Sequence, residues 1–360
     1  MSAMKGVVFT GRRQLEIQTF DDPVPGDDDI VLEMKASGFC GSDLHYYRGE
    51  RNASVAARPA AFLAEHGIRL ADPIIAGHEP CGVVAELGRN VNPKSFRKGD
   101  RVMVHHYKGC SYCDPCRNGW VQMCDRGALV YGQTAHGAHA HYMRVPAKTL
   151  ISLPQEISFS AGAAISCGTG TAFAAMERLE LSARDTLAVF GLGPVGQSAI
   201  QLARAMGVRS FAVDVSDERV AAAEQVFGAA EAINSTKADP IEAIMQWTRG
   251  LGATVAIDCT GVDAARQAAV RCTSNWGRIA FVGVGGSVGL DVWPDLMVRQ
   301  RTIIGHWTFS DTGLARCVRF VAEHGVDIDK QFSDRWRLED ADVAYKKFDL
   351  QTAGKAYFAF

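Results

Sequence analysis

The chain has 360 residues, of which 47% are hydrophobic, and its formal net charge is -2. A chain of this length can bury large cores and is long enough for about two domains. A charge this close to neutral provides no basic surface for nucleic acid or an anionic membrane. The apolar stretches are too short to span a bilayer, and the sequence starts without the apolar core of a signal peptide, so we expect a cytoplasmic protein.

The first half of the chain, to about residue 165, is predicted to be mainly β. Short apolar and β-branched segments alternate there with glycine and proline turns. The predicted strands include residues 7–9, 30–36, 82–87 and 101–104. Residues 50–72 are alanine-rich, and we interpret them as an insertion with a short helix that is broken near Pro59.

From about residue 169, strand-like segments alternate with amphipathic helical segments. Strands are predicted at 186–190, 210–214, 253–258 and 278–284, and helices at 195–206, 218–227 and 263–272. This alternation is typical of a parallel, doubly wound sheet. The last part of the chain is predicted to add helices at 314–323 and 338–348 and a strand at 355–360.

A glycine-rich turn lies between the strand at 186–190 and its helix. Its sequence is Gly191-Leu192-Gly193-Pro194-Val195-Gly196. The first glycine permits a tight turn, the second lets a phosphate approach the backbone, and the third lets helix and strand pack closely. Asp214 ends the next strand, where a carboxylate can bind ribose hydroxyls and repel a 2′-phosphate, which predicts NAD rather than NADP. Arg219 is a candidate contact for the adenosine. The equal alternative is that Arg219 is a solvent-exposed helix residue without a role in binding.

The chain contains ten cysteines, four of which form a compact run: Cys110, Cys113, Cys116 and Cys124. Four thiolates at this spacing can surround one tetrahedral zinc and leave no position for water, which predicts a structural zinc site. A zinc ribbon that binds nucleic acid is the alternative, and the balanced charge around the run disfavours it.

A second set of possible zinc ligands consists of Cys40, His78 and Cys167, with Glu79 next to His78. Three protein ligands and one open position are what a catalytic zinc requires. Taken singly, however, a cysteine is often only buried, and a lone histidine is more often a hydrogen-bonded residue than a ligand.

Together, these motifs resemble those of the zinc-containing medium-chain dehydrogenases, the family of alcohol, sorbitol and threonine dehydrogenases. The resemblance covers nearly the whole chain. It rests on Gly38-Phe39-Cys40-Gly41-Ser42-Asp43, Gly77-His78-Glu79, the four-cysteine run, Ser166-Cys167-Gly168, the glycine turn with Asp214, and Val282-Gly283-Val284. It implies an α/β protein with two domains. Residues 1–168, completed by 308–360, would form a GroES-like β-rich catalytic domain, and residues 169–307 a Rossmann domain with a doubly wound parallel sheet that binds NAD.

The resemblance also implies roles for the residues near the second zinc site. Cys40, His78 and Cys167 would bind a catalytic zinc, and Glu79 would lie close enough to exchange as a ligand. Asp43 would hydrogen-bond His78 and fix its tautomer. Ser42 would take the proton of the alcohol and pass it through the nicotinamide ribose to His45. The alternatives are a turn hydroxyl for Ser42 and a surface imidazole for His45.

Further candidates follow from the same resemblance. Val282, Gly283 and Val284 match a cofactor-binding segment, and His306 and Trp307 match the stretch whose backbone holds the nicotinamide carboxamide. Packing between domains is an equal alternative for Trp307. His105 and His106 precede the four-cysteine run, where the family places a residue of the substrate pocket, and an imidazole there would suit a substrate with extra hydroxyls. The cluster of His136, His139 and His141 could bind a metal, but the resemblance implies a strand of the β domain there, which we favour.

The favoured activity is that of an NAD-dependent zinc alcohol dehydrogenase, with one catalytic and one structural zinc per chain. It would oxidise a secondary alcohol reversibly to a ketone, and polyols and sugar-like alcohols are among the candidate substrates. One alternative is a dehydrogenase that forms aldehydes from primary alcohols, and another is a catalytically silent, zinc-stabilised relative that binds nucleotides. A homodimer or homotetramer is expected, and residues 50–72 would form either a lid, a subunit contact or a tolerated surface loop.

Overall fold

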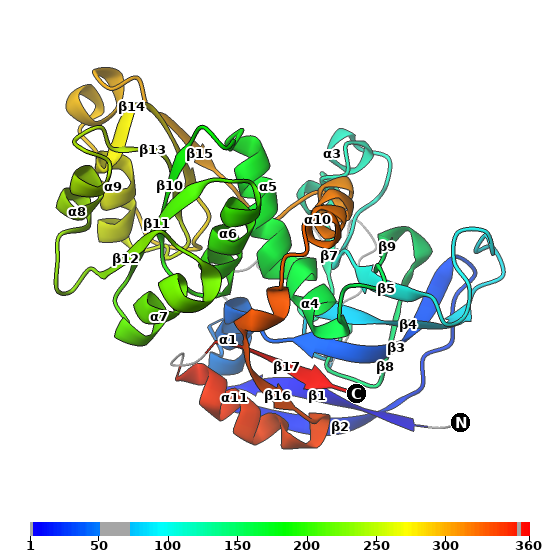
Figure 1. Cartoon of the computed structure of the whole chain (residues 1–360). Coiled ribbons are helices and arrows are strands. Elements are labelled where there is room, and N and C mark those ends of the chain that lie inside the picture. The colour runs from blue at the N-terminus through cyan, green and yellow to red at the C-terminus, as the bar shows by residue number, and fades with distance from the viewer. Residues whose placement is uncertain (1–2, 51–72, 351–353) are drawn as a thin grey trace. The chain divides into compact units, whose positions relative to one another are not determined.

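The computed structural model describes residues 3–50, 73–350 and 354–360 (Figure 1). It divides the chain into two compact units. The first unit contains residues 1–167, 309–322 and 332–360, and the second contains residues 168–308 and 323–331. The predicted insertion at 50–72 lies outside the described residues, except for Glu50.

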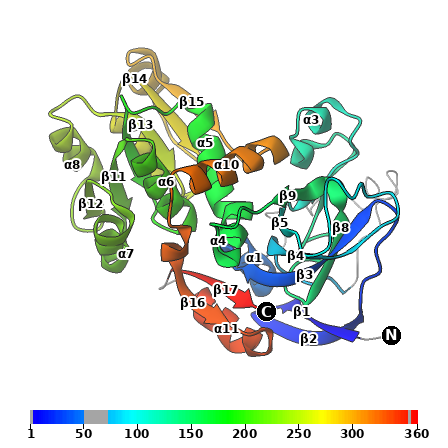
Figure 2. The ribbon, with the colours of Figure 1, turned by 45° about the vertical axis from the view of Figure 1, so that its right-hand side comes forward.

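The first unit is built on a seven-stranded sheet that is mostly antiparallel. Its central strand β3 is buried along most of its length, and Ile30, Leu32 and Met34 belong to a hydrophobic core. The spatial order of the strands is β16 (Phe332–Trp336), β17 (Lys355–Ala359), β3 (Asp29–Gly38), β4 (Glu79–Leu87), β5 (Arg101–Val104) and β9 (Leu150–Ser152), and β8 (Tyr142–Pro146) also pairs with β3. In Figure 2, β17 runs beside the β1–β2 hairpin and close to β3.

Smaller elements complete the first unit. A hairpin and a short strand pair add to the main sheet, and helices follow several of its strands. The strands are β1 (Ala3–Gly11), β2 (Gln14–Asp21), β6 (Tyr107–Lys108) and β7 (Leu129–Val130). The helices and helical turns are α1 (Gly41–Arg48), α3 (Asp114–Arg117), η3 (Val121–Met123), η4 (Ala147–Thr149), α4 (Phe159–Ala164), η5 (Ile165–Thr169), α10 (Asp311–Glu323), η9 (Leu338–Asp340) and α11 (Ala341–Asp349).

The second unit is a six-stranded parallel sheet with helices on both faces (Figure 1). Its strands lie in the order β12 (Glu231–Asn234), β11 (Arg209–Asp214), β10 (Thr186–Phe190), β13 (Ala253–Asp258), β14 (Thr273–Phe281) and β15 (Thr302–Gly305). The helices and helical turns are α5 (Gly170–Arg178), α6 (Pro194–Ala205), α7 (Asp217–Ala222), η6 (Ala223–Phe227), α8 (Pro240–Trp247), α9 (Asp263–Arg271), η7 (Val292–Met297) and η8 (Ile328–Gln331). Across the sheet, the strands run backward in sequence from β12 to β10 and then forward from β13 to β15. This order is the arrangement of a Rossmann fold.

The predicted fold class is confirmed, although some predicted boundaries differ. The helix expected at 218–227 is divided into α7 and the wider helical turn η6, which ends at Phe227 and is followed by Gly228 with a φ of +87°. The strand expected at 278–284 begins earlier, at Thr273, and ends at Phe281. Hydrophobic periodicity shows that an element exists, but its ends depend on local turn geometry that the period does not report.

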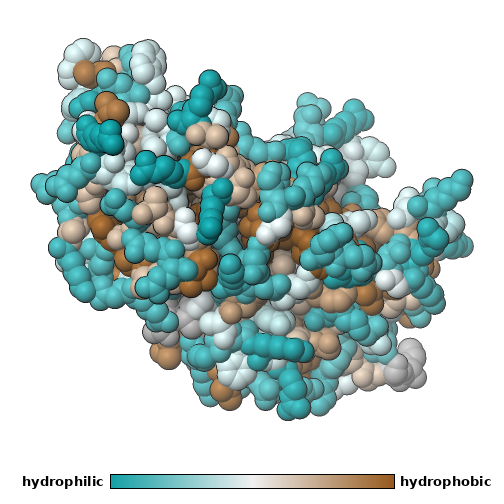
Figure 3. Space-filling model, viewed as in Figure 1, coloured by the Kyte–Doolittle hydropathy of each residue, from teal (hydrophilic) through white to brown (hydrophobic). Residues whose placement is uncertain are grey.

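The face of the molecule seen in Figure 3 is mostly hydrophilic, with apolar residues scattered among polar ones. No helix in the described part of the chain combines the length and apolar character needed to cross a bilayer.

Candidate active site

Four side chains of the first unit form a compact group of possible metal ligands: Cys40, His78, Glu79 and Cys167. One ligand atom from each lies within 4.8 Å of all the others. The sulfur of Cys167 is 3.8 Å from that of Cys40 and 3.5 Å from Nε2 of His78. The structure therefore brings together the residues that the sequence suggested for a catalytic zinc.

The sheet explains how residues so far apart in sequence come together. Strand β3 ends at Gly38, and β4 begins at Glu79, and these two residues are partners in the antiparallel register. Cys40 follows the end of β3 and His78 precedes the start of β4, so both lie at the same edge of the sheet. Cys167 reaches this edge from the helical turn η5, which follows α4.

Asp43 orients His78 toward this group. Its Oδ1 is 2.8 Å from Nδ1 of His78, and its Oδ2 accepts a hydrogen bond of 2.9 Å from the backbone N–H of Cys40. Both side chains are buried. With Nδ1 directed at a carboxylate, Nε2 is the nitrogen available to a metal.

The electrostatics of the group favour a bound cation. Burial lowers the pKa of His78, but the Asp43 carboxylate and Cys40 outweigh burial and raise this pKa well above its usual value. The hydrogen bond between the two thiols lowers the pKa of Cys40 and raises that of Cys167. Without a metal ion, His78 and Cys167 therefore keep their protons. A metal ion that binds these ligands displaces the protons.

Glu79 forms a buried ion pair with a residue that the sequence did not suggest. Nζ of Lys355 lies 2.5 Å from Oε2 of Glu79, and both side chains are at most 1% exposed. Burial raises the pKa of Glu79 to about 8, although Lys355 opposes the rise. A lysine at the start of an otherwise apolar final strand was the available signal, but only the pairing of β17 with β3 identifies its partner.

The two residues of the expected proton relay lie on the same helix, α1, in different surroundings. The hydroxyl of Ser42 is 3.2 Å from Nε2 of His78 and donates a hydrogen bond of 3.3 Å to the sulfur of Cys40. His45 is partly exposed, and its Nδ1 is 3.0 Å from a carboxylate oxygen of Glu50. Ser42 thus lies within the ligand group, whereas His45 lies at the surface.

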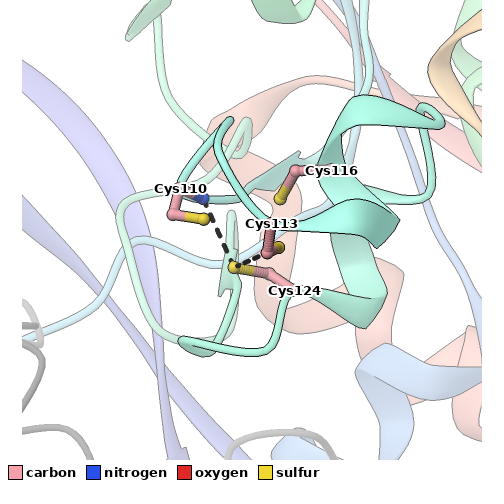
Figure 4. Close-up of side chains that lie close together, drawn as sticks. All are labelled: Cys110, Cys113, Cys116 and Cys124. Atoms are coloured by element: carbon pink, nitrogen blue, oxygen red, sulfur yellow. Dashed lines mark hydrogen bonds between the residues drawn. The ribbon is translucent and has the colours of Figure 1, made fainter.

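The four cysteines of the compact run form a second ligand group (Figure 4). Their sulfurs lie within 4.8 Å of one another and point toward a common centre. Two of them, those of Cys113 and Cys124, are 3.8 Å apart. Backbone N–H groups lower the pKa of Cys110 to about 6, whereas burial raises that of Cys116 to about 12. Short helical turns bring them together: Cys113 precedes α3, Cys116 lies within it, and Cys124 follows η3.

In the second unit, the glycine turn has the geometry expected of a dinucleotide-binding loop. Gly191 has a φ of +88°, and a Cβ on Gly196 would lie 1.9 Å from the carbonyl oxygen of Gly191. Only glycine fits these two positions. Gly193 precedes α6, whose first two residues are Pro194 and Val195, so the backbone N–H groups of the helix start face the loop.

Asp214 is positioned at this loop by hydrogen bonds from the backbone. Its Oδ2 accepts the N–H of Leu192 at 2.7 Å, and its Oδ1 accepts those of Val215 and Ser216 at 2.8 and 3.0 Å. Nη1 of Arg219 is 3.8 Å from Oδ2. The structure therefore brings Asp214 and Arg219 together beside the glycine turn.

The other candidate cofactor contacts follow the next strands of the sheet. Val282 and Gly283 donate backbone hydrogen bonds of 2.8 and 2.9 Å to Asp258, and Val284 follows them. His306 follows β15 and is buried, whereas Trp307 is exposed. All these residues lie at the carboxyl ends of parallel strands, where doubly wound sheets bind their ligands.

The donor atoms of the two groups suit zinc. Sulfur with nitrogen, and four sulfurs, are typical zinc ligand sets, whereas calcium and magnesium prefer oxygen. Within residues 3–50, 73–350 and 354–360, these are the two such groups found.

Comparison with known proteins identifies the family. Residues 26–155 match the model of the alcohol dehydrogenase GroES-like domain, and residues 194–323 match that of the zinc-binding dehydrogenase. The chain belongs to the zinc-containing medium-chain dehydrogenases. It is an oxidoreductase of the alcohol dehydrogenase family, as the motifs suggested.

Two relatives and one solved structure illustrate the similarity. The chain is 36% identical over 359 residues to the uncharacterized zinc-type alcohol dehydrogenase-like protein YphC of Escherichia coli, covering 99% of this chain and 95% of that protein. It is 29% identical over 347 residues to the sorbitol dehydrogenase of Bacillus subtilis, covering 96% and 93%. The alcohol dehydrogenase TADH from Thermus sp. ATN1 has a TM-score of 0.87 and 25% identity, with 99% of each chain covered.

Proposed function

We propose that this protein is an NAD-dependent zinc dehydrogenase that oxidises a secondary alcohol to a ketone and catalyses the reverse reaction. The observation that carries the proposal is the group of Cys40, His78 and Cys167. These residues supply three zinc ligands, and Glu79 stands close to them in an ion pair with Lys355. Three ligands leave one coordination position for the substrate hydroxyl.

The chemistry is divided between the bound groups and the protein. Zinc supplies a Lewis acid that makes a hydroxyl more acidic, and NAD supplies the acceptor for a hydride. The protein fixes the ligands, because Asp43 holds His78 in one tautomer and also caps the backbone of Cys40. Rigid ligands are needed because the position of the metal determines where the alcohol binds.

Ser42 is the proposed acceptor of the alcohol proton. Its hydroxyl already lies within 3.3 Å of two ligand atoms, on Cys40 and His78. His45 is proposed to release the proton to solvent, since it is partly exposed and contacts Glu50 at the surface. An imidazole suits this role because its usual pKa is close to neutral.

Asp214 is proposed to select NAD over NADP. Its carboxylate is held at the glycine turn by three backbone N–H groups, so it cannot easily turn away from a 2′-phosphate. Arg219 is a proposed contact for the adenosine, and the segments 282–284 and 306–307 are proposed to hold the nicotinamide side. The four-cysteine group is proposed to hold a structural zinc, since four thiolates leave no position for substrate.

A secondary alcohol is favoured over a primary one because the chain is similar to a sorbitol dehydrogenase along nearly its whole length. We also propose two domains, one formed by residues 1–168 with 308–360 and one by residues 169–307. The protein is proposed to be a homodimer or homotetramer in the cytoplasm. The proposal of a silent nucleotide-binding relative is weakened by the complete ligand group.

The test is a screen for NADH formation by the zinc-loaded protein over matched primary and secondary alcohols, polyols and sugars. The proposal predicts turnover with secondary alcohols and polyols, and slower turnover with primary alcohols of the same length. Faster turnover of primary alcohols would favour the aldehyde-forming alternative. If the protein with both zinc ions bound failed to reduce NAD with any of the alcohols tested, the proposed function would be wrong.

A further inference from the structure

The side chain of His106 lies next to the candidate catalytic group without belonging to it. Its ring centroid is 5.1 Å from that of His78, with the ring planes at 66°. His106 comes two residues after the end of β5, which pairs with β4 near its start, so the sheet itself brings this ring to His78. The residue is 1% exposed, yet it is not among the four possible ligands.

Hydrogen bonding determines which nitrogen of His106 carries the proton. Nδ1 lies 3.0 Å from the backbone carbonyl oxygen of Ser166. Because a carbonyl only accepts, Nδ1 must donate, and in a neutral imidazole Nε2 then carries a lone pair.

Nε2 of His106 is an acceptor without a hydrogen-bond partner among the residues that the structure describes. The rings of Tyr107, Phe309 and His105 have centroids 4.2, 5.9 and 6.3 Å from the centroid of the His106 ring. A buried acceptor without a partner is expected to have a polar partner when the site is occupied.

We infer that His106 determines substrate specificity by accepting, at Nε2, a hydrogen bond from a second hydroxyl of the substrate. The enzyme then prefers diols and polyols, with a hydroxyl close to the reacting one, over alcohols that have a single hydroxyl. This inference rests on the proposed function. A site built to bind a hydroxyl rejects an analogue that lacks it, because the acceptor is then left without a partner.

The neighbouring residue His105 provides a matched control. It is also 1% exposed, and burial lowers its pKa. Its Nε2 lies 3.2 Å from the carbonyl oxygen of Phe309, so its available N–H is used within the protein. Replacing His105 removes a buried imidazole of the same size but leaves the acceptor of His106 in place.

The experiment compares kcat/KM for 2,3-butanediol and 2-butanol in the wild type and in His106→Phe, His106→Asn and His105→Phe. The wild type is expected to prefer the diol by about tenfold or more. His106→Phe should lower this ratio by about tenfold, while kcat/KM for 2-butanol changes by less than about threefold. His106→Asn keeps a hydrogen-bond acceptor and should therefore retain part of the preference for the diol. His105→Phe should keep the wild-type ratio even if it is less stable.

Two further measurements separate recognition from a structural role. Calorimetric titration of the NADH-bound enzyme, which cannot oxidise an alcohol, should show weaker binding of the diol by His106→Phe and unchanged binding of 2-butanol. The zinc content of His106→Phe should equal that of the wild type. Equal losses for both alcohols would mean that His106 only supports Ser166 and the segment of Cys167, and would overturn the inference.

The outcomes also separate this inference from the proposed function. Oxidation of 2-butanol by a wild type with no preference for the diol would overturn the inference and leave the proposed function intact. If the zinc-loaded wild type formed NADH from neither alcohol, nor from any other in the screen, the proposed function itself would fail. A wild type without this preference overturns the inference on its own, so that outcome does not depend on the folding of the variants.

Discussion

Lys355 and Glu79 form an ion pair that is fully enclosed in the protein, with Nζ and Oε2 2.5 Å apart. Lys355 also donates a hydrogen bond of 2.8 Å to the carbonyl oxygen of Phe39, next to Cys40. The pair therefore connects the last strand of the chain to the segment of Cys40 and to the segment of His78. A buried charge of this kind is stable only while its partner is present.

Replacing Lys355 alone should therefore be costly. We expect Lys355→Met to lower the free energy of unfolding by about 3–5 kcal/mol, and the double variant Glu79→Gln/Lys355→Met to recover most of this loss. Urea unfolding of the zinc-loaded proteins measures both effects.

The loss in Lys355→Met should depend on pH. The pKa of Glu79 is already raised from 4.5 to about 8, and removing the lysine raises it further. A carboxyl whose folded pKa is raised destabilises the fold as pH rises from its unfolded pKa to its folded pKa, so wild type and variant lose stability alike up to about pH 8, and the extra loss in Lys355→Met should be larger at about pH 9.5 than at about pH 7. A single variant as stable as the wild type at both pH values would show that the pair carries no such role.

Asp43→Asn should weaken the metal bound by His78. The amide has the size of the carboxylate but lacks its charge, and its single oxygen cannot accept hydrogen bonds from both Nδ1 of His78 and the backbone N–H of Cys40. We expect zinc affinity at this group to fall by about 10–100-fold, as is usual when such a partner is lost. Competition with a chelator measures it, and the zinc of the four-cysteine group in the same molecule serves as the control. Equal loss of both metals would indicate general unfolding instead.

Cys116→Ser should remove the structural zinc. Zinc analysis is expected to show one metal fewer per chain, and thermal unfolding should begin about 5 °C lower or more. The matched control is Cys272→Ser, because Cys272 is also buried but lies in the core of the second unit without other metal ligands. An unchanged zinc content in Cys116→Ser would contradict the assignment of this group.

Asp214→Asn should relax the choice of cofactor. Asparagine keeps an oxygen that can accept the N–H of Leu192, but it removes the charge that repels a 2′-phosphate. We expect the preference for NAD over NADP, measured as the ratio of kcat/KM values, to fall by about tenfold or more. The Arg219→Gln variant tests the neighbouring contact separately. A preference that stays constant in Asp214→Asn would argue that other residues select the cofactor.

His139 should contribute to acid sensitivity. It is buried between Ser37 and Tyr345, which it contacts at 2.7 and 2.6 Å. Burial lowers its pKa from 6.5 to about 4. The unfolded state therefore binds this proton first, and stability falls by about 3 kcal/mol as pH decreases from 6.5 to 4. In His139→Gln, the dependence of urea unfolding on pH over this range should be shallower than in the wild type, and an identical dependence would exclude this role.

The sequence predicted the parts of the structure that depend on local patterns. Helical and strand periods predicted the parallel sheet, and the spacing of Cys110 to Cys124 predicted a compact ligand group because short turns join the four residues. The glycine turn was predictable since Gly191 and Gly196 occupy positions that no other residue fits.

Contacts between distant strands were not predictable in this way. The partner of Glu79 depends on the pairing of β17 with β3, and the place of His139 beside Tyr345 depends on α11. For His106, the sequence suggested a pocket position only through the family resemblance. The bond from Nδ1 to Ser166, which leaves Nε2 as an acceptor, is visible only in the structure.

The central claim is that a zinc held by Cys40, His78 and Cys167 activates an alcohol for transfer of a hydride to NAD. The most direct test is to remove zinc, restore it stepwise, and measure bound metal and NADH formation from a secondary alcohol together. We predict that activity returns only as the second zinc binds, and that Cys167→Ala, with the four-cysteine group filled, stays inactive. Full activity in protein that contains only the zinc of the four-cysteine group would contradict the account.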